Sequence, residues 1–134
     1  MTLLSTAAQN ASLDNDYGAT KGPNAPAAHQ LALFNGDPLL GGTELTATGG
    51  YARVTVTNNG TTWPAASSGE KTSAAITFPT STAAWSDTAT HWVLYDDADG
   101  TTAWDCGVLN EELAVVAAST VAQTTLTIFY NGGL

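Results

Sequence analysis

This sequence is poor in cysteine, in basic residues and in long apolar runs, and each shortage excludes a class of protein. Its single cysteine, Cys106, has no partner for an intramolecular disulfide. One cysteine and two histidines are also too few ligands for a tetrahedral structural zinc site. We therefore expect no metal and no cofactor, and we interpret Cys106 as a small buried hydrophobe.

The charge balance is strongly acidic. Lysine and arginine total 3, aspartate and glutamate total 12, and the formal net charge is −9. Affinity for nucleic acid comes largely from basic side chains that displace counterions from phosphates, so we expect no nucleic-acid partner. The same shortage argues against an anionic membrane surface. Because no apolar run approaches the roughly 18 residues of a membrane span, we also expect no membrane partner.

The residues that are abundant indicate short strands joined by tight turns. The 134 residues, of which 43% are hydrophobic and 13 are glycine, suit one compact domain. Apolar or alternating runs bounded by turn residues predict strands at residues 30–34, 51–57, 73–78, 90–95, 101–109 and 124–130. In the second run, Val54 and Val56 should face the core and Tyr51 and Arg53 the other side. We expect an all-β fold, an antiparallel jelly-roll-like β-sandwich.

The first 28 residues differ in composition from the rest. They are small and polar, and Pro23 and Pro26 disfavour a helix or a central strand there. Such a segment buries too little on its own to offset its ordering entropy. We therefore expect residues 1–28 to form an extended N-terminal arm held against its own domain or a neighbouring subunit. Residues 29–134 would form the β-sandwich domain.

The acidic residues are the candidates for chemistry. Asp96, Asp97 and Asp99 precede Gly100, and Glu111 and Glu112 are adjacent. Paired carboxylates suit a small glycosidase, and clustered oxygen ligands suit calcium. However, Asp-Gly is a hairpin signal, aspartate is favoured in turns, and the spacing is not that of an EF-hand. We expect a solvated turn, no catalytic residue and no enzyme.

The four tryptophans are the candidates for recognition. Trp63 and Trp85 fall in loops, so we expect them to contact a ligand or a neighbouring subunit. Trp92 and Trp104 fall in paired strands, so we expect them in the core. The candidate contact residues are thus Trp63, Trp85, Asp96, Asp97 and Asp99. They leave open a carbohydrate-binding module that recognises a host surface glycan.

Four segments occur in an order that resembles a known family. They read LALFNGDP at residues 31–38, GGYAR at 49–53, AITFP at 75–79 and THWVLYD at 90–96. The chain resembles small bacteriophage virion proteins labelled phage tail fibre proteins, over about residues 30–128. Members commonly begin with a short amphipathic helix, whereas this chain begins with the predicted arm.

The resemblance implies a non-enzymatic structural protein of a bacteriophage virion, located at the particle surface. It brings no catalytic residue, and its expected partners are major capsid or tail subunits and two further copies in a homotrimer. No fibrous repeat is evident, so a capsid-surface decoration (cement) protein or a short head or tail fibre knob is favoured. The capsid surface is slightly preferred. The alternative is a carbohydrate-binding host-recognition module of a tail fibre.

Overall fold

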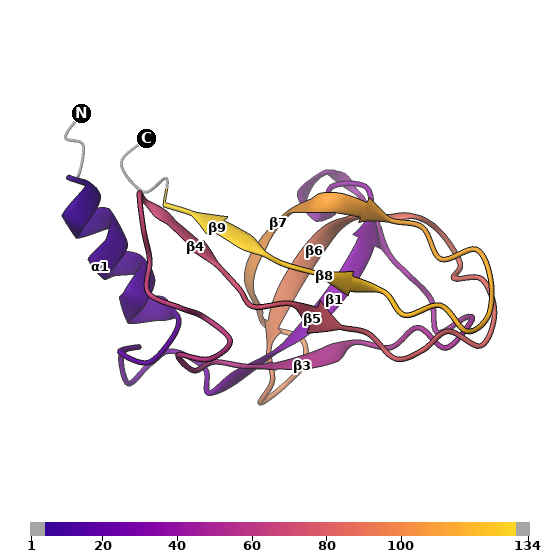
Figure 1. The fold of residues 1–134 in the computed structure, drawn as a ribbon, viewed down its shortest axis with the longest axis horizontal. Helices are drawn as coiled ribbons and strands as arrows, with labels where there is room; N and C mark the ends of the chain where they lie inside the picture. The colour runs from indigo at the N-terminus through magenta and orange to yellow at the C-terminus, as the bar shows by residue number, and fades with distance from the viewer. Residues whose placement is uncertain (1–4, 131–134) are drawn as a thin grey trace.

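The computed structural model describes residues 5–130, in which strands predominate (Figure 1). The helical elements are α1 (Thr6–Asp16) and the short 3₁₀ helix η1 (Pro38–Leu40). The strands are β1 (Ala28–Asn35), β2 (Thr43–Glu44), β3 (Val54–Thr57), β4 (Glu70–Thr72), β5 (Ile76–Thr77), β6 (Ala89–Asp96), β7 (Ala103–Leu113), β8 (Gln123–Thr124) and β9 (Thr127–Phe129). The strand pairs of this part of the chain are antiparallel, which confirms the predicted all-β class.

Five strands form the main sheet, in the order β2-β1-β6-β7, with β3 pairing along the same edge of β1 as β2. The long central strands β1 and β6 are rich in apolar, β-branched and aromatic residues, which favour the strand conformation. A hairpin at residues 97–102 joins β6 to β7, and β7 forms an outer edge of the sheet. The runs at 30–34, 90–95 and 101–109 were thus correctly predicted as strands.

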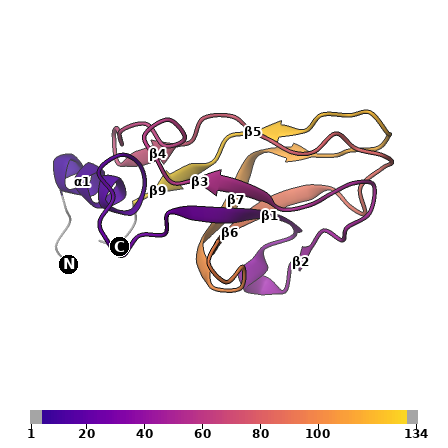
Figure 2. The same ribbon diagram turned by 90° about the horizontal axis from the view of Figure 1, so that it is seen from below.

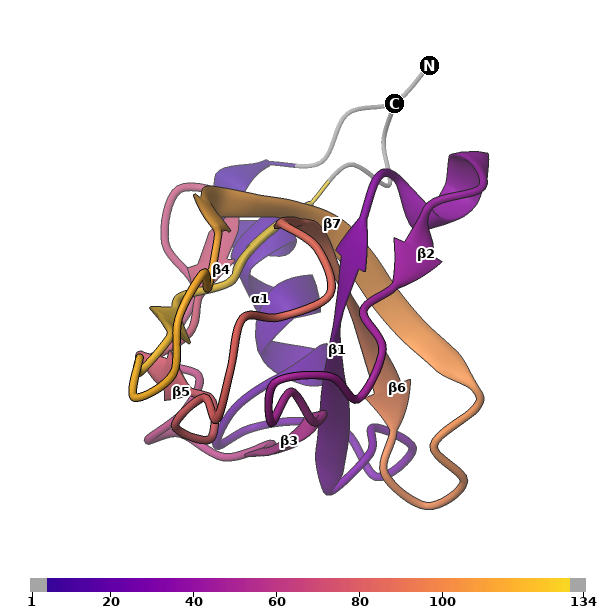
Figure 3. The ribbon, with the colours of Figure 1, turned by 90° about the vertical axis from the view of Figure 1, so that its right-hand side faces the viewer.

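Two short sheets, β4-β9 and β5-β8, form a second layer against one face of the main sheet (Figures 2 and 3). The layers form an open sandwich that does not close into a barrel. Leu31, Leu33 and Trp92 of the main sheet share one hydrophobic cluster with Leu126 and Ile128 of the second layer. This cluster is the core of the protein.

The strand predicted at residues 51–57 starts later than expected, at Val54. Gly49 and Gly50 have positive φ values of 67° and 83°, so the chain before β3 forms a loop. The alternation of core-facing and outward-facing side chains predicted for residues 51–57 therefore does not hold before Val54. Tyr51 is consequently in the core, where its hydroxyl accepts a hydrogen bond of 2.9 Å from the Leu33 N–H. The expectation that Tyr51 faces away from the core was wrong.

The expected extended arm is a helix over Thr6–Asp16, so that part of the prediction is wrong. Ser5 caps the helix by accepting a hydrogen bond from the Ala8 N–H, and alanine is the best helix former. Pro23 lies beyond the end of α1, and proline disturbs only the residues close to it. The boundary between an arm and a domain at residue 28 remains a prediction.

Helix α1 and the turn after it are fastened to the sandwich by a buried asparagine. The Asn58 side chain donates to the carbonyls of Asp16 (3.0 Å) and Pro26 (2.9 Å) and accepts from the Gly18 N–H (2.8 Å). Tyr17 packs in the main core with its ring 4.8 Å from that of Trp63. These contacts hold the N-terminal segment against its own domain.

An ion pair joins α1 to β4. Lys71 is only 2% exposed, and its ammonium contacts the Asp14 carboxylate, which also accepts a hydrogen bond from the Ala66 N–H. Burial works against the charged form of Asp14, but the hydrogen bonds from Lys71 and Ala66 prevail and lower its pKa. The buried charge of Lys71 therefore depends on α1 being docked.

Replacing Asp14 tests this dependence. We expect Asp14→Ala to lower the free energy of unfolding by about 3 kcal/mol, because the Lys71 ammonium loses its partner inside the protein. The double variant Asp14→Ala/Lys71→Met should recover most of that loss. Guanidinium unfolding followed by tryptophan fluorescence measures both, and a double variant no more stable than Asp14→Ala would contradict this role of the pair.

Candidate functional site

The central strands carry apolar side chains on both faces. On one face of β1 and β6, Leu31, Leu33 and Trp92 pack into the main core. On the other, Phe34 and Val93 belong to a second cluster with Ala32, Tyr95 and Cys106. A strand that is apolar on both sides is typical of a sheet that is covered on both sides. We call the side of the second cluster the outer face.

The outer face contains an open hollow of about 400 Å³. It is lined by Phe34, Pro38, Leu39, Val93, Tyr95, Ala103, Trp104, Asp105 and Cys106. Phe34 and Val93 are almost inaccessible, at 8% and 3% exposed. The hollow is thus a depression with an apolar lining.

Exposed apolar side chains project beside this hollow. Leu39 and Leu40 of η1 are 78% and 84% exposed, and Trp104 is 37% exposed. The turn that carries the leucines is well defined, because the Asp37 carboxylate accepts from the Leu39 N–H at 2.9 Å and Gly41 adopts a left-handed conformation. Contiguous exposed apolar groups mark interaction surfaces. The outer face is therefore our candidate functional site.

The charged side chains near the outer face are hydrogen-bonded within the chain. Arg53 makes a two-pronged ion pair with Glu44 (2.8 and 2.9 Å), donates to the Gly100 carbonyl (2.7 Å) and lies 4.2 Å above the Tyr95 ring. Asp105 accepts from the Tyr17 hydroxyl at 3.1 Å, and burial raises the pKa of its carboxyl. A surface with neutralised charge can approach another protein without a large electrostatic cost.

Cys106 contributes an uncharged thiol to the hollow. Burial raises its pKa, and the neighbouring carboxylates of Asp105 and Asp37 raise it further. The cysteine is half-buried, with part of its surface reaching solvent. The interpretation of Cys106 as a small hydrophobe agrees with this environment, because the neutral thiol lacks the reactivity of a thiolate.

The structure corrects the interpretation of two tryptophans. Trp63 and Trp85 are 0% and 6% exposed, so neither offers a surface contact in the folded chain. Trp85 packs edge-on against Tyr51 and Phe78 at 5.4 and 5.7 Å between ring centres. Loop segments can cross the edge of a core, so a tryptophan in a loop is not necessarily at the surface.

Trp104, which the sequence placed in the core, is instead 37% exposed; it borders the hollow, and its ring lies 6.2 Å from that of the buried His29. The pairing of β6 with β7 shifts register between Leu94 and Tyr95, and Trp104 is the extra residue of β7 at that point. Such a bulge redirects side chains away from the regular alternation. Sequence periodicity did not reveal this, because the bulge has no glycine signal.

The aspartates of the β6–β7 hairpin fold the turn. Asp96 accepts from the Ala98 N–H, and Asp99 accepts from the N–H groups of Thr101 and Thr102, all at 2.9 Å. The hydrogen bonds from Thr102 lower the pKa of Asp99 to about 2. A solvated turn was the reading favoured from the sequence. Surface contacts by Asp96, Asp97 and Asp99 remain a prediction.

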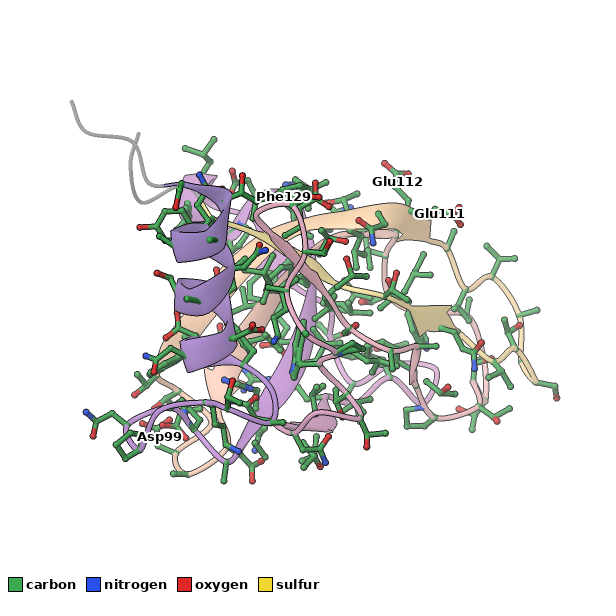
Figure 4. All side chains as sticks on the ribbon, turned by 60° about the vertical axis from the view of Figure 1, so that its left-hand side comes forward. Asp99, Glu111, Glu112 and Phe129 are labelled. Carbon is green, nitrogen blue, oxygen red and sulfur yellow. The ribbon has the colours of Figure 1, made fainter. Side chains whose placement is uncertain are left out.

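The two acidic groups do not form one site. Asp99 lies in the hairpin before β7 begins, whereas Glu111 and Glu112 lie near its other end (Figure 4). The intervening strand separates them by roughly 25 Å, and paired glycosidase carboxylates lie within about 10 Å of each other. Among residues 5–130, no three histidine, cysteine, aspartate or glutamate side chains converge in a way that could hold a metal ion. No helix in these residues is long and apolar enough to span a membrane.

Comparison with known families gives the identity. The family described as "Podophage GP4 fiber I protein gp80" matches residues 3–128. The chain belongs to this family. The predicted resemblance to phage fibre-type proteins is thereby confirmed, and the chain is a structural component of a phage virion. Searches of the curated proteins and of the solved structures gave no match.

His29, on β1, is a buried polar group that sequence analysis did not single out. It is 0% exposed, neither ring nitrogen has a hydrogen-bond partner, and its ring lies 5.5 Å from that of Tyr17. Burial lowers its pKa to about 4, although the carboxylates of Asp96 and Asp97 act in the opposite direction. The imidazole is therefore neutral at pH 7.

This burial predicts a pH dependence of stability. A lowered pKa in the folded state means that the unfolded chain binds more protons between pH 6.5 and 4, so His29 destabilises the fold as the pH falls through that range. The loss relative to His29→Leu should reach about 3 kcal/mol at pH 4. Urea unfolding of both proteins from pH 7.5 to 4 measures it. A difference that stays constant over this range would show that His29 is not responsible.

Proposed function

We propose that this chain is a non-enzymatic knob of a short virion fibre, in which three copies pack through their outer faces at the particle surface. The observation that carries the proposal is the apolar hollow with Leu39, Leu40 and Trp104 exposed beside it. Burial of apolar surface contributes roughly 25 cal/mol per Å², and Leu39 and Leu40 at this face are among the most exposed large apolar side chains of residues 5–130. Membership of a fibre family supports a structural role.

Electrostatics favour the outer face for contact between identical chains. Each copy carries a net charge of −9, so copies repel one another unless they meet where charge is low. Arg53 and Glu44 neutralise each other beside Tyr95, and Asp105 is held by Tyr17. A closed ring of copies would cover every outer face at once.

A fibre knob suits the sequence better than a shaft. The chain has no fibrous repeat, and its open sandwich is compact. The fibre description of the family favours a fibre over the capsid-surface decoration that the sequence slightly preferred. Trp63 and Trp85 are buried, so they do not provide the exposed aromatic surface that binding of a host glycan was expected to use.

Charged substitutions at the exposed leucines test the contact. We expect the wild-type protein to sediment with about three times the 13.7 kDa mass of one chain. Leu39→Asp/Leu40→Asp should sediment as a monomer, because each copy would bring two carboxylates into an apolar interface. Both side chains are exposed in the single chain, so far-UV circular dichroism should be unchanged.

Val116→Asp is the matched control for this experiment. Val116 is 81% exposed, like the two leucines, but lies in the loop after β7 and does not line the hollow. It should assemble like the wild type. A wild-type protein that stays monomeric at all concentrations, or a double variant that assembles as well as Val116→Asp, would contradict the proposal.

Phage particles test the role in the virion. Particles that carry Leu39→Asp/Leu40→Asp in place of the wild-type chain should lose it from the virion, whereas Val116→Asp should be retained at full occupancy. Antibody labelling seen by electron microscopy then distinguishes a fibre from the capsid shell. Labelling spread over the capsid shell would replace the fibre knob with a decoration protein.

A further inference from the structure

Strands β7 and β9 run beside one another without pairing. Backbone hydrogen bonds join β7 to β6 and β9 to β4, and no backbone bond joins β7 to β9 in the described residues. The Asn110 side chain spans the space instead, donating to the Thr125 carbonyl (3.0 Å) and the Thr127 hydroxyl (3.3 Å). We call the space between residues 105–110 and 125–129 the seam.

The edge of β7 that faces the seam carries unpaired backbone groups. The Leu33 N–H donates to the Tyr51 hydroxyl and the Leu33 carbonyl accepts from the Leu45 N–H, so both groups point away from β6. Trp92 lies opposite Leu33 on β6 and does not bond to it. The N–H and carbonyl of Trp92 therefore point toward β7.

Gly107 is opposite Trp92 and bonds back to it. Its neighbours Cys106 and Val108 therefore direct their backbone groups away from β6. The Cys106 N–H donates to the Asp105 carboxylate (2.9 Å), and the Val108 carbonyl accepts from the Trp92 indole N–H (3.2 Å). The Cys106 carbonyl and the Val108 N–H are the groups that remain for an added strand.

The edge of β9 faces the seam in the same way. The Leu126 carbonyl accepts from Ser73 at 2.8 Å, and the Tyr130 N–H donates to Gly69 at 3.0 Å, so these alternate residues bond toward β4. Thr127 and Phe129, which lie between them in the alternation, direct their backbone groups toward β7. Two unpaired strand edges thus face each other across the seam.

The seam is hollow and apolar. A cavity of about 260 Å³ lies between the strands, with Trp92 and Ile128 buried in its lining. Val108 on one side and Phe129 on the other are 65% and 62% exposed, and Figure 4 shows Phe129 beside β7. Alternating apolar side chains along unpaired edges are the features that accept an added β-strand.

The charges around the seam indicate which chain supplies that strand. Asp105, Glu111 and Glu112 lie on β7, which has no basic residue. Of the three cations of this chain, Arg53 and Lys71 are already held in ion pairs, which leaves Lys21. A second copy would thus bring mainly further negative charge to the seam.

We propose that the seam accepts an extended segment of a different virion chain, one with apolar residues at alternate positions and lysine or arginine at the end near Glu111 and Glu112. This inference rests on the proposed function, since it describes how the knob attaches to the rest of the particle. The added strand bonds to the free edges of β7 and β9 and fills the cavity between them. Its basic residues balance the acidic end of β7.

Site-specific photocrosslinking in assembled particles tests the occupant. The probe is p-benzoylphenylalanine, placed at Phe129 in the seam or at Leu39 on the outer face, and adducts are identified by mass spectrometry. We expect the Phe129 probe to link to another virion chain, within a few residues of a lysine or arginine. The Leu39 probe should link to a second copy of this chain, which tests the proposed function separately.

Charge variants provide a second readout. Glu111→Gln/Glu112→Gln should lower the yield of the Phe129 adduct several-fold and leave that of Leu39 unchanged, whereas Asp97→Asn/Asp99→Asn, at the other end of β7, should change neither. A Phe129 adduct to a second copy, or an adduct segment without basic residues, would overturn the inference. Absence of a Phe129 adduct while Leu39 reacts would overturn it and leave the proposed function standing.

Discussion

The apolar character of β1 and β6 on both faces is the constraint from which the rest of the structure follows. Leu31, Leu33 and Trp92 pack against the second layer, and Phe34 and Val93 are buried in a second cluster on the opposite face. The layer that covers the first face is formed by β4, β5, β8 and β9. The second face carries a hollow beside exposed leucines. In the proposed function, assembly of copies buries these leucines.

Charge is the feature by which the two proposed interfaces of this chain differ. At the outer face, Arg53 and Glu44 form an ion pair within the chain and Asp105 is hydrogen-bonded by the Tyr17 hydroxyl, so we propose this face for contact between identical copies. The seam is bordered by Glu111 and Glu112, for which this chain offers little compensating charge. In the proposed arrangement, repulsion between like charges disfavours contact between two copies at the seam.

Sequence patterns predicted the parts of the fold that depend on local chemistry. The runs that became β1 and β6 are long and apolar, and Asp-Gly marked the hairpin, so these elements were found. Helix α1 was missed, because it buries only Leu13 and gains its stability from Asp14, Tyr17 and the distant Lys71 and Asn58. Trp92 was correctly predicted in the core. Trp63, Trp85 and Trp104 were misplaced, because their burial depends on tertiary packing and on a β-bulge, which leave no periodic pattern in the sequence. The hollow and the seam are each lined by strands that are far apart in the sequence, so no local sequence motif predicts them.

The accessibility of Cys106 is the most direct test of the central claim that assembly covers the outer face. This thiol lines the hollow and is the only cysteine of the chain, so a small neutral alkylating reagent modifies a single site. Because Cys106 also borders the seam, Glu111→Gln/Glu112→Gln particles serve as a control for protection from that side. The rate of its modification should be compared between monomeric Leu39→Asp/Leu40→Asp protein and intact virions, with unfolded protein as the reference. We expect Cys106 to react in the monomer and to be strongly protected in the virion until the particle is dissociated. Equal rates in the monomer and in the virion would show that the outer face stays open, and would contradict the account.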